Sequence, residues 1–235
     1  MKTIGLLGGM SWESTAEYYR ILNQEAARRC GGLSSARIVL HSVDFAEVEA
    51  LLSAGEWGAI AAHLGWLGRG LRRAGADFLL ICTNTMHKVA DEISMAAELP
   101  VLHIGDATAE AVLRAGLRKV GLLGTRPTME QDFMTGRLAA HGIEVLVPGA
   151  KDRDMVHKTI FEELCRGQFL EKTRANYLRV MQQMAEAGAE GIVLGCAEIP
   201  LLVRSEDAPL PLFDTTRIHA LVAVEMALDP TCEAD

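Results

Sequence analysis

Two short segments place reactive side chains directly after apolar runs. Residues 83–85 (Thr-Asn-Thr) follow the run 78–82, and residues 196–198 (Cys-Ala-Glu) follow the run 191–194. Short apolar runs predict buried strands, and ligands of open α/β sheets bind beyond the carboxyl ends of strands. A thiol at a helix start is expected to have a lowered pKa, which makes Cys196 a candidate acid or base. Each segment is therefore a candidate part of an active site.

The two segments belong to an internal repeat. Three matches occur in the same order in both halves: residues 2–8 with 118–124, 74–80 with 187–193, and 99–101 with 210–212. Such order favours two related halves, although apolar strands with glycine ends also resemble one another in unrelated α/β proteins. Extended without gaps, the second match places Thr83 opposite Cys196. Two related lobes would thus offer one catalytic group on each side of a shared cleft.

Apolar runs alternate with amphipathic stretches along the chain, which predicts an α/β fold with parallel sheets. We expect two similar lobes, each with a mainly parallel four-stranded sheet flanked by helices, related by a pseudo-twofold axis with the active site between them. The first lobe would hold residues 1–105 plus 214–235, and the second 106–213. The expected strands are 3–8, 37–41, 78–82, 101–103, 119–123, 143–147, 191–194 and 210–213.

The side of the strand on which a residue lies decides between two neighbouring candidates, Cys82 and Thr83. Successive strand residues point to opposite faces of a sheet. If Thr83 faces the cleft, Cys82 must face the core of its lobe.

Composition excludes several classes of function. The chain has 235 residues, 49% of them hydrophobic, and a formal net charge of -8. This acidic balance does not favour nucleic acid or an anionic membrane surface. The start lacks the features of a signal peptide, so we expect a soluble, cytoplasmic protein. An odd set of five cysteines and scattered histidines, without metal-ligand spacing, predicts neither a disulfide framework nor a metal site. We interpret Cys30 and Cys232 as bystanders.

Four segments in this order resemble the aspartate/glutamate racemase family over essentially the whole chain: Gly8-Gly9-Met10-Ser11, Asn84-Thr85-Met86-His87, residues 124–133 and Gly195-Cys196-Ala197-Glu198. The resemblance implies two Rossmann-like lobes, no cofactor, an amino-acid substrate and a homodimer. It also implies inversion at Cα by two opposed acid/base residues. By this resemblance the substrate-binding residues would be Gly9, Met10, Ser11, Asn84, Thr85, Thr125, Ala197 and Glu198.

The pair Thr83 and Cys196 resembles a branch of the family that is specific for L-aspartate or L-glutamate. By that resemblance Cys196 abstracts the Cα proton of the L-enantiomer, and the Thr83 hydroxyl lies on the D side. A hydroxyl is a poor proton carrier, so reaction from D to L should be slow or absent. Phe45 and Cys165 stand where acid-selective members carry basic residues, and Ala197 replaces a threonine. A less polar or broader substrate range therefore stays open.

The sequence leaves open the role of Glu198 and the exact function of the chain. Glu198 could orient or deprotonate the thiol, or it could simply complement a helix start. His87 is expected to be a structural histidine with satisfied hydrogen bonds. The chain could be a single-cysteine decarboxylase or cis-trans isomerase of the same superfamily, or a relative that binds amino acids without catalysis.

Overall fold

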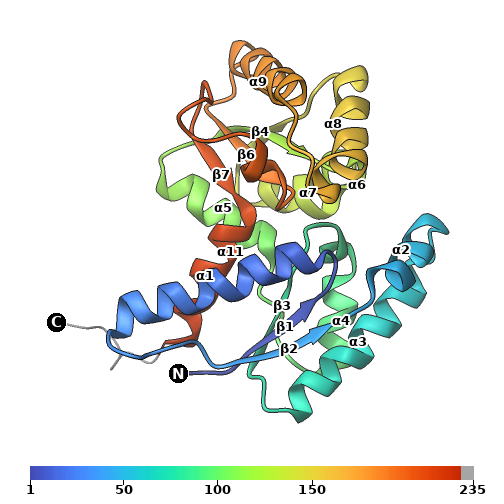
Figure 1. The fold of residues 1–235 in the computed structure, drawn as a ribbon, viewed down its shortest axis with the longest axis vertical. Coiled ribbons are helices and arrows are strands. Elements are labelled where there is room, and N and C mark those ends of the chain that lie inside the picture. Colours follow the sequence, from blue (N-terminus) through green and yellow to red (C-terminus); the bar gives the residue numbers. More distant parts are fainter. Residues whose placement is uncertain (229–235) are drawn as a thin grey trace. The chain divides into compact units, whose positions relative to one another are not determined.

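The computed structural model describes residues 1–228, and they fall into two compact units. One unit consists of Met1–His103 with the segment from His219 onward, and the other of Ile104–Ile218. Each unit is a parallel β-sheet flanked by helices (Figure 1), so the predicted fold class is confirmed. No helix within residues 1–228 is long and apolar enough to cross a bilayer.

The first unit contains a three-stranded parallel sheet in the order β2-β1-β3. Its elements are β1 (Ile4–Gly8), α1 (Trp12–Cys30), β2 (Ile38–Ser42), α2 (Phe45–Ser53), α3 (Trp57–Arg73), β3 (Phe78–Ile81), the 3-10 helix η1 (Thr85–Val89) and α4 (Ala90–Ala97).

The predicted fourth strand of this sheet, residues 101–103, is wrong. Only Val101 forms a bridge, to Leu79. The Leu79 amide donates to the Pro100 carbonyl, and the Leu102 amide donates to the Leu79 carbonyl. Helix α5 then begins at Ile104, so the run ends before a second pair can form.

The second unit contains a four-stranded parallel sheet in the order β5-β4-β6-β7. Its elements are α5 (Ile104–Arg114), β4 (Lys119–Gly124), α6 (Arg126–Glu130), α7 (Asp132–Ala140), β5 (Glu144–Leu146), α8 (Ala150–Glu162), η2 (Leu164–Arg166), α9 (Glu171–Glu186), β6 (Gly191–Gly195), α10 (Ile199–Leu202) and β7 (Leu212–Asp214). Helix α11 (Thr215–Ala227) begins in this unit and ends in the first.

The two faces of the first sheet have separate cores, and β3 contributes to both in alternation. Phe78, Leu80 and Cys82 are buried with α1 and α11. Leu79 and Ile81 are buried with α2, α3 and α4. Figure 1 shows α1 and α3 on either side of this sheet. The alternation follows the period of two of an extended strand, and it places Cys82 in the core, as predicted.

Strand β6 alternates in the same way in the second unit. Ile192 and Leu194 pack with α8 and α9, and Cys196 continues this series at the edge of the same core. Val193 packs with α5 and α7 on the other face.

The internal repeat is matched by strand register. Ile4 pairs with Phe78 across β1 and β3, and Val120 pairs with Gly191 across β4 and β6. The repeat aligns Ile4 with Val120 and Phe78 with Gly191, so the two sheets use the same pairing. Thr83 and Cys196 therefore hold equivalent positions in their own units.

Candidate active site

Cys196 lies in the turn between β6 and α10. The preceding residue, Gly195, is buried, and a Cβ there would lie 2.9 Å from a Thr128 methyl carbon and 3.1 Å from the Leu123 carbonyl oxygen. Cys196 itself is half-buried, and its thiol donates a hydrogen bond to Glu198 Oε2 over 2.9 Å. A thiol that already points its proton at a carboxylate is arranged for proton transfer.

The expected lowering of the Cys196 pKa is wrong. Burial raises the pKa of this thiol well above its usual value, and the Glu198 carboxylate and Cys165 raise it further. Helix α10 has only four residues, so its dipole offers little to a thiolate. The thiol is protonated in the free protein at neutral pH, and a proton acceptor is needed before it can act as a base.

Two neighbours of this thiol come from distant parts of the chain: Cys165, which stands where acid-selective family members carry a basic residue, and Tyr177, which the sequence does not single out. Cys165, on η2, lies close enough to raise the Cys196 pKa. Tyr177, on α9, is buried, and its hydroxyl donates to the Val156 carbonyl over 3.2 Å. Burial raises the Tyr177 pKa, with smaller contributions from Cys196 and Cys165. Cys165 and Tyr177 are far from Cys196 in the sequence, and only the fold brings them close to it.

Thr83 lies in the turn between β3 and η1. It is half-buried, whereas the preceding Cys82 is completely buried. Burial raises the pKa of the Cys82 thiol far above its usual range. Cys82 is thus an inert core residue, and of the two neighbouring candidates only Thr83 is partly exposed.

The glycine turn after β1 stands beside the Thr83 turn. Gly9 has φ of 91°, and a Cβ there would lie 2.3 Å from the Val43 carbonyl oxygen. Its amide donates to Thr15 Oγ1, while Ser11 caps α1 by accepting from the Ser14 amide. The Ser14 hydroxyl donates to the Cys82 carbonyl over 2.9 Å. The structure therefore brings residues 9–11 to the same sheet end as residues 83–85.

The second unit repeats this arrangement with Thr125. Gly124 and Gly195 pair in register at the ends of β4 and β6. Thr125 is buried, and its hydroxyl lies 3.1 Å from the Thr128 hydroxyl. Thr125 thus stands at the same sheet end as the Cys196 turn.

The remaining predicted site residues lie on these turns. Asn84, Thr85, Met10 and Glu198 are buried, and Ala197 is half-buried. Arg126, which follows Thr125, pairs with Asp154 over 2.6 Å.

Comparisons with known proteins agree with this organisation. The Asp/Glu/hydantoin racemase family profile matches residues 7–223. The chain belongs to this family. A candidate Asp/Glu racemase structure from Yersinia pestis is 52% identical, with 97% of this chain and 100% of that chain covered and a TM-score of 0.93. An aspartate racemase homologue from Pyrococcus horikoshii is 33% identical, covers 97% of this chain and 99% of its own, and has a TM-score of 0.84.

Another relative of this chain is more distant in sequence. The broad specificity amino-acid racemase of Bacillus subtilis is 23% identical over 159 residues, which are 67% of this chain and 68% of the relative.

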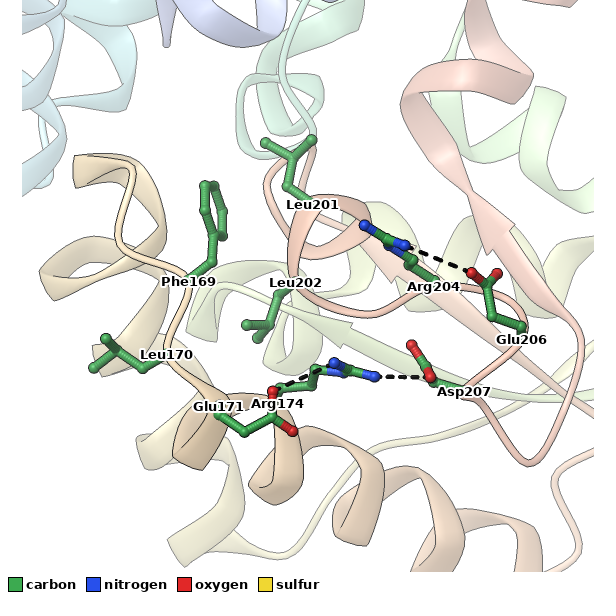
Figure 2. Close-up of a pocket in the computed structure, with 9 residues that line it drawn as sticks. All are labelled: Phe169, Leu170, Glu171, Arg174, Leu201, Leu202, Arg204, Glu206 and Asp207. Atoms are coloured by element: carbon green, nitrogen blue, oxygen red, sulfur yellow. Dashed lines mark hydrogen bonds and ion pairs between the residues drawn. The ribbon is translucent and has the colours of Figure 1, made fainter.

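A surface pocket of about 280 Å³ lies against α10 in the second unit (Figure 2). Its charged groups pair with one another: Arg174 lies 2.7 Å from Asp207 and 3.3 Å from Glu171. The lining residues are Phe169, Leu170, Glu171, Arg174, Leu201, Leu202, Arg204, Glu206 and Asp207. Neither Cys196 nor Glu198 is among them, so we assign this pocket no part in the chemistry.

Within residues 1–228 no three histidine, cysteine or acidic side chains are grouped so that they could hold a metal ion. The described cysteines are free thiols, and Cys232 lies outside the described residues. Met86, Met129 and Met134 are buried in the cores.

Proposed function

We propose that the chain is a cofactor-independent amino-acid racemase that acts on L-aspartate or L-glutamate, with Cys196 and Thr83 serving opposite faces of Cα. The observation that carries the proposal is the hydrogen bond from the Cys196 thiol to the Glu198 carboxylate at a strand end. The equivalent position in the other half of the repeat holds Thr83. Family membership supports the reaction class.

The first step is removal of the Cα proton. Glu198 accepts the thiol proton, and the resulting thiolate takes the proton from Cα of the L-enantiomer. The electron pair left on Cα is delocalised into the adjacent substrate carboxylate. Because the free thiol has a raised pKa, we propose that Glu198 is the group that receives its proton when the thiolate forms in the substrate complex.

The second step is protonation from the opposite face. The Thr83 hydroxyl donates its proton to Cα, and the threonine is then reprotonated from water. The thiol keeps the proton taken from Cα, and Glu198 releases the proton that it received to water, so that one proton is taken from water and one is returned to it. A hydroxyl has a far higher pKa than a thiol and is a poor base. We therefore expect a higher maximal rate for L-to-D than for D-to-L conversion, while kcat/KM is equal in both directions because the enantiomers have the same free energy.

A test of the proposal is incubation with each of the standard chiral L-amino acids in deuterated buffer, followed by chiral separation. We expect Cα deuteration and the D-enantiomer with aspartate or glutamate. The full panel is needed because Phe45 and Cys165 replace basic residues of acid-selective relatives. Release of carbon dioxide from a malonate, without Cα exchange, would instead indicate the single-cysteine decarboxylase. Binding without Cα exchange would indicate a non-catalytic relative.

We further propose, from the family resemblance, that the protein is a homodimer. Light scattering coupled to size-exclusion chromatography should give twice the chain mass of 25.5 kDa. The chain mass itself would contradict the proposal.

A further inference from the structure

The first unit buries three histidines next to the Thr83 turn. His87, His103 and His219 are at most 6% exposed. The His87 ring lies 4.7 Å from the His103 ring and 5.5 Å from the His219 ring, centroid to centroid, both in edge arrangements. The proposed reaction uses none of them.

Hydrogen bonds fix which nitrogen of two of these rings carries the proton. His219 Nε2 lies 2.8 Å from the Leu102 carbonyl oxygen, so Nε2 is the donor, and Nδ1 accepts from the Tyr18 hydroxyl over 2.7 Å. His87 Nδ1 lies 2.8 Å from the Thr83 carbonyl oxygen, so Nδ1 is the donor there. Burial lowers the pKa of His87 and of His219 to about 3, and both rings are neutral.

Within the described part of the chain, the other ring nitrogen of His87 makes no such hydrogen bond. Its Nε2 is buried and has no hydrogen-bond partner within residues 1–228. Expected from sequence to be fully satisfied, His87 instead leaves a polar atom unpaired, which costs stability. The benefit of a histidine at this position must therefore come from Nδ1 and the carbonyl that it holds.

The carbonyl in question belongs to the proposed proton donor. Holding the Thr83 carbonyl fixes the peptide plane after Thr83 and hence its ψ angle. A β-branched side chain such as threonine has few rotamers, and the backbone angles decide which are allowed. The position of the Thr83 hydroxyl is therefore tied to the His87 ring.

We propose that His87 is the positioning residue for Thr83, braced by His103 and by the His219–Tyr18 pair. The inference rests on the proposed function, since it assigns His87 to the protonation step at one face of Cα. A proton donor that moves by about 1 Å can lose about 100-fold in rate. Proton removal by Cys196 takes place in the other unit and does not depend on this clamp.

The test compares three variants with L-aspartate and L-glutamate in deuterated buffer. His87→Asn keeps an N–H close to the position of Nδ1, and His87→Leu removes the donor but fills the space. Val89→Ala is the matched control, because it removes buried apolar volume from the same 3-10 helix. The readout is the ratio of D-product formed to L-amino acid deuterated with retention.

We expect His87→Leu to lower this ratio about 10- to 100-fold while retained-configuration deuteration changes little. His87→Asn should restore the ratio to within a few-fold of the wild type, and Val89→Ala should leave it unchanged. An unchanged ratio in His87→Leu, or a parallel fall of inversion and deuteration in His87→Leu and Val89→Ala, would overturn the proposal.

Nitrogen-15 NMR of the wild type separates this inference from the proposed function. We expect His87 as a neutral ring protonated at Nδ1, and a proton at Nε2 instead would overturn the proposal without any activity measurement. A wild type that deuterates neither substrate would overturn the proposed function and, with it, the role in protonation. The NMR result would still decide whether the hydrogen bond exists.

Discussion

Replacing Glu198 by glutamine should have opposite effects on the alkylation of Cys196 and on racemisation. Two negative charges separated by the 2.9 Å between Cys196 Sγ and Glu198 Oε2 repel by about 6 kcal/mol at an effective dielectric constant of about 20 and by about 1.4 kcal/mol in bulk water. Cys196 is half-buried, yet burial is the main cause of its raised pKa, so the lower value is the minimum expected effect. That value is about a tenfold change in the ratio of thiolate to thiol.

The assay measures both quantities on the same Glu198→Gln protein. Iodoacetamide modification of the Cys196 peptide, followed by mass spectrometry at neutral pH, should become about tenfold faster or more, since the thiolate is the nucleophile. Racemisation should fall by about 10²- to 10⁴-fold, since the proton acceptor is lost.

Glu190→Gln is the matched control for this experiment. Glu190 precedes the same strand, β6, and its carboxylate accepts from the Arg118 and Lys119 amides, away from the thiol. It should change neither rate. Slower alkylation in Glu198→Gln, or unchanged racemisation, would refute the assignment of Glu198 as the group that takes the thiol proton.

Further predictions concern the first unit. Thr83→Cys should raise D-to-L turnover by supplying a second thiol, whereas Cys82→Ala should leave activity nearly intact; complete loss in a folded Cys82→Ala would show that the strand register is wrong. Gly9→Ala should lower the free energy of unfolding by about 1–3 kcal/mol in urea denaturation, because φ is 91° and the new Cβ would meet a backbone oxygen at 2.3 Å; an unchanged midpoint would contradict this. His87 and His219 have pKa values lowered to about 3 in the folded state, so below about pH 6.5 the unfolded chain binds more protons and stability should fall by up to about 1.4 kcal/mol per pH unit for each. A flat stability profile between about pH 6 and 4 would contradict their neutral burial.

The positions of most strands were predictable from sequence, and so was the face of the sheet on which each residue at a strand end lies. Both depend on periodicity alone. Alternation along β3 separates Cys82 from Thr83, and the repeat aligns Thr83 with Cys196. Both inferences use only the period of two and the order of apolar runs. The fourth strand of the first sheet could not be excluded in this way, because a three-residue apolar run does not show how many residues will pair.

The electrostatics of the site could not be predicted, because they depend on contacts between distant segments. The rule for a thiol at a helix start gave the wrong direction for Cys196, since α10 is short and the sulfur lies among Glu198, Cys165 and buried apolar residues. His87 was interpreted as satisfied, since nothing in the motif shows that its Nε2 faces other rings rather than a partner.

The most direct test of the central claim is Cα deuterium exchange by Cys196→Ser. Wild type incubated with L-aspartate or L-glutamate in deuterated buffer should lose the Cα proton signal. Serine keeps the shape of the side chain but is a much weaker acid, so exchange should fall by several orders of magnitude, about 10²- to 10⁴-fold, while the variant still binds substrate. Substantial exchange in Cys196→Ser would contradict the assignment of Cys196 as the base.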